Sequence, residues 1–286
     1  MKHVNRMALS VCLAIGCAWA VRAQEQSVPM VLQITREWVK PGRAGTAHDK
    51  TESAFVEAMR RAKWPTNYLA LASMSGRSRA LFLTSYATFE AWEKDTAAVA
   101  KNTTLSNAID NAYLADGELL EGLDQGVFYY DPEKSMNAHA DLSPFRFYEL
   151  TLFHVKPGKN KEWGEVVKMV KEANAKAIPD AHWGMFYQAY GGDGDTYLVI
   201  SGHKSLAEVD KGFADGKKFE AALGEEGMKK LNEMYGDCVE SSSQQLFSVD
   251  PKMSYVKEEW IKADPEFWGA KAMTATMAGK KQDGGK

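Results

Sequence analysis

Cysteine is almost absent from the body of this chain. Of the three cysteines in 286 residues, Cys12 and Cys17 lie near the N-terminus, and only Cys238 lies further along. A single thiol excludes a disulfide framework. No Cys–His motif surrounds Cys238, so we expect it to be a small buried hydrophobe.

Several other features are missing as well. The chain has no phosphate-binding loop, dinucleotide fingerprint or nucleophilic serine elbow. Its 35 basic and 38 acidic residues give a net charge of −3, which argues against nucleic acid as a partner. Beyond the N-terminal segment no apolar run is long enough to span a bilayer. A small-molecule ligand and self-association remain as expected partners.

The N-terminal segment has the pattern of an export signal. Lys2 and Arg6 precede the uncharged apolar run 7–21, and Val21-Arg22-Ala23 offers small residues for cleavage. We predict a signal peptide over 1–23 and a periplasmic or extracellular mature protein. A lipoprotein signal ending at Cys17 is the alternative, although the leucine of "LAIG" lies one position too early for it.

Two copies of one unit account for the rest of the chain. The stretch "VKPG" occurs at 39–42 and again at 155–158, within "VLQITREWVKPGR" and "FYELTLFHVKPGK". The copies also end alike, in "VFYYDPEKS" (127–135) and "LFSVDPKMS" (246–254). Matching motifs at both ends, at nearly constant spacing, predict a tandem duplication.

Each copy predicts the element order βαββαβ. A strand rich in β-branched and aromatic residues ends at Pro-Gly, a helix follows, then two strands around a turn, a second helix and a last strand. The "GGDGD" turn (191–195) resembles part of a calcium-binding repeat, but a hairpin turn explains its glycines. We expect an α+β fold in which two tandem ferredoxin-like units pack sheet to sheet as a pseudo-dimeric α/β barrel. The expected boundaries are unit one at 30–131, a linker at 132–145, unit two at 146–250, a docked C-terminal extension at 251–273 and a disordered tail at 274–286.

The opening strand and corner, "FYELTLFHVKPGK", resemble those of NIPSNAP-like domains in the dimeric α/β-barrel superfamily. The resemblance covers both units. It implies the barrel fold and a ligand held between a sheet and the elements that cover it. The superfamily also contains cofactor-free monooxygenases and chlorite dismutase-like haem proteins.

Strand alternation selects the candidate site residues. One strand face holds polar and aromatic groups, which we expect to line a cavity between the two sheets, while the aliphatic face packs on helices. The candidate pocket residues are Gln33, Thr35, Glu37, Thr151, Phe153 and Tyr187, with Glu149 as the candidate catalytic residue. A carboxylate in an apolar pocket would serve as an acid–base group. The alternative is that Glu149 and Gln33 only hydrogen-bond neighbouring strands.

The histidines show no metal-binding spacing among themselves, so we predict no metal. His48 lies near the start of a helix that we expect to face solvent. We expect no cofactor, with haem as an alternative that rests on fold resemblance.

The sequence therefore predicts an exported protein that binds a small apolar or aromatic molecule in an inter-sheet cavity. A cofactor-independent monooxygenase-like enzyme is one form of this hypothesis. The alternatives are a haem-binding oxidoreductase of the chlorite dismutase-like type and a non-catalytic interaction protein. Whether the protein is an enzyme stays open at this point.

Overall fold

The computed structural model describes residues 28–269. The expected signal peptide (1–23), the expected tail (274–286) and the end of the expected extension (270–273) lie outside the described residues, and so do Cys12 and Cys17. Those expectations stay predictions. Within 28–269, no helix combines the length and apolar character that a membrane span requires.

Each copy folds as the predicted unit. The first contains β1 (Val31–Val39), α1 (Thr46–Ala62), β2 (Tyr68–Ser73), β3 (Arg79–Tyr86), α2 (Phe89–Lys101), α3 (Thr103–Gly117) and β4 (Leu120–Tyr130). The second contains β5 (Phe147–Val155), α4 (Asn160–Ala177), β6 (Gly184–Tyr190), β7 (Thr196–His203), α5 (Leu206–Cys238) and β8 (Val239–Val249). Two short helices follow, α6 (Glu258–Ala263) and α7 (Pro265–Trp268).

The second helical region is interrupted in both copies. In unit one it is split into α2 and α3, and the Asn102 side chain accepts a hydrogen bond from the Leu105 N–H at the start of α3. In unit two α5 is also interrupted, at Gly224, where the backbone leaves the helical region (φ 68°, ψ 173°) and separates two helical segments. The element order is therefore the predicted one, with the second helix interrupted in each copy.

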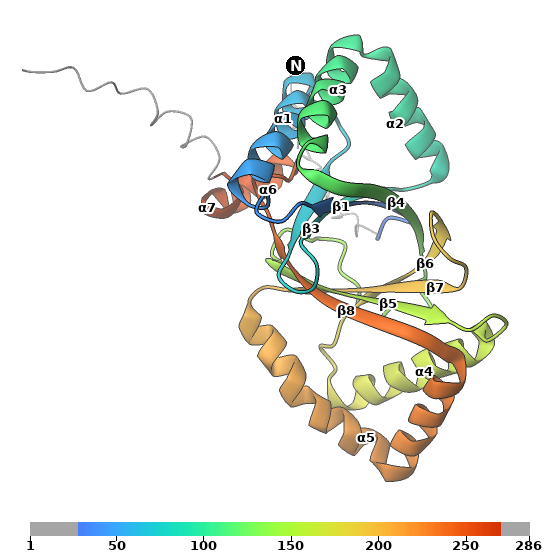
Figure 1. The fold of residues 1–286 in the computed structure, drawn as a ribbon. Coiled ribbons are helices and arrows are strands. Elements are labelled where there is room, and N and C mark those ends of the chain that lie inside the picture. The colour runs from blue at the N-terminus through green and yellow to red at the C-terminus, as the bar shows by residue number, and fades with distance from the viewer. Residues whose placement is uncertain (1–27, 270–286) are drawn as a thin grey trace, which may run out of the picture.

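The eight strands close into one barrel in the order β1-β3-β2-β8-β5-β7-β6-β4. The second strand of each unit pairs with the last strand of the other, β2 with β8 and β6 with β4. Figure 1 shows the barrel in the middle, with α1 to α3 on one side and α4 and α5 on the other. The predicted pseudo-dimeric barrel is confirmed. Backbone hydrogen bonds join the two units along two seams, β2 with β8 and β6 with β4.

The repeated VKPG motif marks the same corner in both units. The register of β1 on β4 shifts between Trp38 and Val39, and that of β5 on β8 shifts at the equivalent place, between His154 and Val155. The glycines of the two motifs, within 39–42 and 155–158, have φ values of 76° and 79°. Glycine adopts this left-handed conformation without strain, which explains why the corner ends in glycine twice.

The repeated DPxxS motif fastens each unit to the other. Ser135 Oγ donates to the Asp131 carbonyl (2.7 Å) and accepts from the N–H of Met185 in β6 (2.9 Å). Ser254 repeats this arrangement, donating to the carbonyl four residues earlier (2.6 Å) and accepting from the N–H of Ala70 in β2 (2.9 Å). Both serines are buried. The motif therefore joins the end of each unit to the second strand of the other unit, and we call it the DPxxS clasp.

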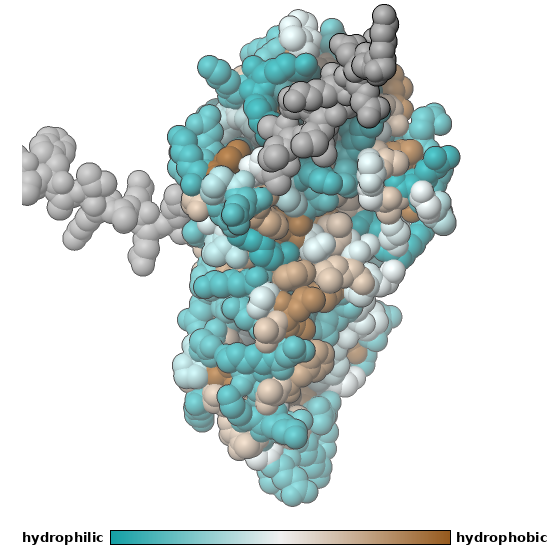
Figure 2. All heavy atoms as spheres, turned by 90° about the vertical axis from the view of Figure 1, so that its left-hand side faces the viewer, coloured by the Kyte–Doolittle hydropathy of each residue, from teal (hydrophilic) through white to brown (hydrophobic). Residues whose placement is uncertain are grey.

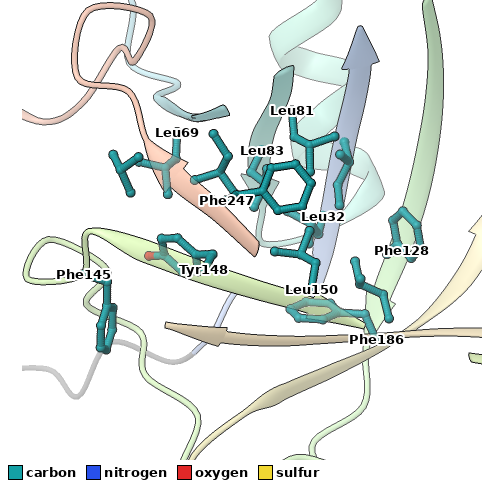
Figure 3. Close-up of a cluster of buried hydrophobic side chains, with 14 of the residues drawn as sticks. Leu32, Leu69, Leu81, Leu83, Phe128, Phe145, Tyr148, Leu150, Phe186 and Phe247 are labelled. Atoms are coloured by element: carbon teal, nitrogen blue, oxygen red, sulfur yellow. The ribbon is translucent and has the colours of Figure 1, made fainter. Parts of the chain in front are cut away.

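The main core fills the barrel, because all eight strands contribute to it. Figure 3 shows these side chains converging between the strands. They include Leu32, Ile34, Leu69, Leu71, Leu81, Leu83, Phe128, Tyr148, Leu150, Phe186, Leu198, Phe247 and Val249. Trp268 of α7, which is 1% exposed, packs against the same cluster.

This core reverses the strand faces that we expected. The aliphatic face, with Leu32, Ile34 and Leu150, points into the barrel, whereas the polar face with Glu37 and Glu149 points toward the helices. Alternation separates the two faces but does not say which one faces the barrel. The interior of an eight-stranded barrel is narrow and filled by side chains, so it takes the aliphatic set.

Candidate functional site

A cavity of about 730 Å³ lies at one end of the barrel, where β1, β2, β5 and β6 begin and β3 and β7 end. Its floor is the top of the barrel core, with Leu32, Leu83, Tyr148 and Phe186. The linker, α2 and α6 form its walls. We call this space the barrel-mouth cavity. Figure 2, viewed from the side, shows apolar side chains reaching the surface at the height of the barrel.

The walls of the barrel-mouth cavity are largely aromatic and aliphatic. Trp64, Trp183, Trp260 and Phe145 line it, together with small residues such as Ala91 of α2. Ordinary small-molecule pockets have volumes of roughly 300–1,000 Å³ and combine apolar walls with a few polar groups. The cavity therefore has the size and the surface of a ligand pocket.

One polar group of the cavity wall is a hydrogen-bonded carboxylate. Asp95 of α2 accepts hydrogen bonds from Trp64 Nε1 (2.9 Å), Thr66 Oγ1 (2.6 Å) and the Tyr86 hydroxyl (3.3 Å). Burial raises the pKa of Tyr86, so its hydroxyl stays protonated and can donate. Asp95 is thus held in place by three donors, as a fixed polar group of the wall.

A pair of histidines forms a second polar group. His139 and His182 lie edge to face with ring centroids 4.7 Å apart, and Phe145 stacks on His182. Burial, His182 and Lys204 lower the pKa of His139, so its ring is mostly uncharged near neutral pH. A neutral imidazole suits an apolar cavity and still offers one donor and one acceptor.

Neither the two histidines of the barrel-mouth cavity, His139 and His182, nor the neighbouring His203 suits a haem. An axial ligand needs a ring nitrogen that faces open space and a partner that fixes the ring. The nitrogens of His182 lie 3.2 and 2.8 Å from the carbonyls of Asp180 and Gly202. Nε2 of His203 is covered by protein, and no hydrogen bond within 28–269 holds the ring of His139. We therefore derive no step through haem, and the expectation of no cofactor stays a prediction.

Glu149 lies away from the barrel-mouth cavity. It lines a separate cleft of about 570 Å³ on the helix side of unit two, with Lys211 and Phe213 of α5. It accepts a hydrogen bond from Gln244, and its other carboxylate oxygen lies 3.9 Å from Nε2 of His203. The side chain is 31% exposed. This is not the desolvated apolar pocket that we expected, and a catalytic role for Glu149 stays a prediction.

The remaining pocket candidates lie on the outer face of the sheets. Gln33 and Thr35 both hydrogen-bond Gln125 of the adjacent β4, at 3.4 and 3.3 Å. Phe153 packs against the core between β5 and α4, and Thr151 shares its strand face. Tyr187 is 42% exposed. None of these residues contributes to the barrel-mouth cavity or to the Glu149 cleft as the structure describes them.

His48 was expected on the surface and is buried instead. It is 3% exposed, and Nε2 lies 3.1 Å from Glu37 Oε2. Burial acts to lower the pKa of His48, but the hydrogen bond to Glu37 and the charge of Asp116 outweigh it and raise the pKa. Our reading of the sequence missed this contact because it compared histidines only with one another. The four-residue spacing of His48 and Glu52, which places both on one helix face, was the available signal.

Comparison with known proteins gives structural similarity alone. The chain matches no protein-family model. It also has no counterpart among curated proteins. Many solved structures match its fold.

Three of these structures illustrate the range. A candidate monooxygenase from Fusobacterium nucleatum subsp. nucleatum has 13% identity and a TM-score of 0.51, covering 78% of this chain and 93% of that one. An anthrone oxidase-like protein has 11% identity and a TM-score of 0.48, covering 82% and 97%. A candidate chlorite dismutase has 12% identity and a TM-score of 0.47, covering 78% and 96%. The similarity to the first of them shows that this chain has the duplicated ferredoxin-like fold of the dimeric α/β barrels.

Proposed function

We propose that the protein binds a small apolar or aromatic molecule in the barrel-mouth cavity. The observation that carries this proposal is the combination of a volume of about 730 Å³ with tryptophan, phenylalanine and leucine walls. Burying flat apolar surface against aromatic walls is favourable, and aromatic rings also gain from stacked or edge-to-face contacts.

The polar groups of the cavity would orient such a ligand. Asp95 can accept a hydrogen bond from a ligand hydroxyl or amine, and His139, whose ring lies against that of His182, can donate or accept one. Lys94 and Lys257 are exposed residues of the lining and suit a weakly acidic substituent. An aromatic molecule with one or two polar substituents fits this arrangement best.

A monooxygenase-like reaction in the same cavity is the finer form of the proposal. This form is supported by the fold shared with a candidate monooxygenase. A shared fold is an analogy and identifies no catalytic residue. Glu149 does not line the barrel-mouth cavity, so acid–base chemistry on a ligand bound there would have to use Asp95 or His139.

The proposal is tested by screening aromatic compounds against the purified protein. We expect a subset of phenols and polycyclic aromatics to raise the melting temperature and to quench tryptophan fluorescence, because Trp64, Trp183 and Trp260 line the cavity. A ligand at 100 times its dissociation constant should stabilise the protein by about 2.7 kcal/mol. Haem belongs in the same panel, with the Soret band as its readout.

A matched pair of variants on α2 locates the binding site. Ala91 lines the cavity and is half-buried, so Ala91→Trp should fill part of it and weaken binding at least roughly tenfold, the loss of about 1.4 kcal/mol. Ala97 is exposed on the same helix and does not line the cavity, so Ala97→Trp should leave binding unchanged. If no compound shifts the melting temperature or the fluorescence, the cavity is only a packing defect and the proposal is wrong.

A further inference from the structure

Four ionisable side chains meet between the sheet and the helices of unit one. Glu37 comes from β1, His48 and Glu52 from α1, and Asp116 from α3. The first three are 3% exposed and Asp116 is 1% exposed. One ligand atom from each lies within 4.8 Å of the others. We call this group the acid–histidine cluster.

If all three carboxyl groups of the acid–histidine cluster are ionised, they carry more negative charge than its one imidazole can balance. Glu37 Oε2 and Asp116 Oδ1 lie 3.1 and 3.5 Å from Nε2 of His48, and these are the ion pairs that Glu37 and Asp116 make within residues 28–269. Glu52 is in no ion pair of that region. Several buried charges of one sign are expensive to desolvate, so protons or a cation must neutralise them.

Two oxygens of the acid–histidine cluster receive no hydrogen bond from a donor group of the described structure. Glu52 Oε1 and Asp116 Oδ2 are both fully covered, and the Glu52 and Asp116 carboxyl groups lie within hydrogen-bonding reach of each other; burial, the nearby carboxylates and this contact raise the pKa of Glu52. The other oxygen of Asp116 is held by the Thr51 hydroxyl at 2.6 Å. A buried acceptor without a donor is destabilising, so these two carboxylate oxygens indicate an occupant between the four side chains.

The second unit shows that the fold does not need charged groups at this place. The residue of β5 that corresponds to Glu37 is Phe153, and the buried residues of α4 one position from the equivalents of His48 and Glu52 are Trp163 and Val167. Tyr235 takes the place of Asp116. Phe153 packs on Trp163 and Tyr235 with ring centroids 4.9 and 6.4 Å apart. One copy therefore fills the site with apolar packing, and the other keeps a buried polar cluster that packing does not require.

We propose that Glu37, His48, Glu52 and Asp116 bind a divalent first-row transition-metal ion. One imidazole nitrogen with several carboxylate oxygens is a donor set that suits Mn²⁺, Fe²⁺ or Zn²⁺. Metal–ligand bonds of about 2.1 Å place neighbouring ligand atoms roughly 3.0 to 3.4 Å apart, close to the 3.1 and 3.5 Å that separate Nε2 from its two carboxylates. Thr51 then acts as the outer partner that orients Asp116.

The site is independent of the barrel-mouth cavity, since none of the four residues lines it. It is also closed to solvent, so we expect the ion to enter while the protein folds. Metal content is therefore best measured on protein that is refolded with the ion present.

The test measures metal directly on the full chain. Protein refolded with Mn²⁺ or Zn²⁺ and then desalted should hold about one ion per chain by mass spectrometry, and protein refolded with a chelator should hold none. With saturating ion the melting temperature should rise by about 5 to 10 °C, whereas Mg²⁺ should have little effect. A Co²⁺ derivative should show visible ligand-field bands.

Variants assign the ion to the cluster. Glu52→Gln keeps the shape of the side chain and removes its charge, and should reduce the metal content at least roughly tenfold. His203→Gln is the matched control, because His203 also lies beside a glutamate, but in unit two and at 3.9 Å; it should keep the full metal content. If Glu52→Gln does not fold, the Co²⁺ bands and the ion-dependent melting temperature of the unaltered chain decide.

Two outcomes overturn the proposal. The first is an unaltered chain that holds no ion after refolding and whose melting temperature is the same with Mn²⁺, Zn²⁺ or chelator. In that case protons neutralise the acid–histidine cluster. The second is a Glu52→Gln variant that folds and keeps the full metal content, which would place the ion elsewhere. Neither result bears on ligand binding at the barrel mouth.

Discussion

At the scale of single residues, Gly191 shows how tightly one backbone position is constrained. It opens the turn between β6 and β7, with φ at 79°, and a Cβ there would lie 2.2 Å from the carbonyl oxygen of Gln125 in β4. Gly194, three residues later in the same turn, has open space around its Cα and no positive φ. Of the three glycines in "GGDGD", the structure requires Gly191 and does not require Gly194, while a Cβ at Gly192 would meet the end of the Gln188 side chain. The predicted hairpin turn is confirmed.

Gly191 and Gly194 give a matched comparison. Gly191→Ala should destabilise the protein by about 1 to 3 kcal/mol from backbone strain alone, and by more if Gln125 cannot move aside. Gly194→Ala should change stability by less than about 0.5 kcal/mol. Urea unfolding measures both. Equal effects from the two substitutions would mean that the turn adapts and that its left-handed corner is not needed.

At the scale of elements, the DPxxS clasp joins the end of one unit to a strand of the other. Ser135 satisfies the N–H of Met185, which lies in a strand that begins about fifty residues later in the chain. A short polar motif thus fixes a contact between two elements that sequence distance keeps apart. The same contact forms after the last strand of each unit, β4 and β8, which explains why the motif occurs twice.

Removing the clasp hydroxyl tests this role. Ser135→Ala leaves the buried N–H of Met185 without its acceptor, and should lower the free energy of unfolding by about 1 to 3 kcal/mol. Ser205→Ala is the control, because Ser205 precedes α5 and its side chain makes no capping hydrogen bond; its effect should be below about 0.5 kcal/mol. Urea titration followed by circular dichroism distinguishes the two. A neutral Ser135→Ala would show that water replaces the hydroxyl.

At the scale of the whole molecule, the two units share one interior. The barrel core draws on all eight strands, and strand pairing crosses between the units at two seams. Neither sheet can therefore lose its partner without exposing a large apolar face. The duplicated chain is one cooperative structure in spite of its two recognisable copies.

Unfolding should reflect this shared interior. We expect a single cooperative transition in urea, with tryptophan fluorescence and far-ultraviolet circular dichroism giving the same midpoint. Trp163 lies in the helix-side core of unit two and Trp268 packs on the shared core, so fluorescence reports on both regions. Two separate transitions would show that the units unfold independently and that the seams contribute little.

The sequence by itself determined the duplication, the element order and the barrel. These follow from local signals, because the period of apolar residues, the Pro-Gly corner and the Asp-Pro end are all written within a few residues of the elements they define. The resemblance to the superfamily pointed the same way, and the structural similarity confirms the fold, whereas a specific NIPSNAP relationship is not confirmed.

Only the tertiary structure decided which strand face is inside and which side chains meet. Alternation places Gln33 and Leu32 on opposite faces of β1, but the closure of the barrel selects the aliphatic face for its narrow interior. The barrel-mouth cavity and the acid–histidine cluster both bring together residues from separate elements. Their proximity depends on how helices and sheets pack over long sequence distances. The four-residue spacing of His48 and Glu52 is a local signal, but it does not show that Glu37 and Asp116 lie beside them.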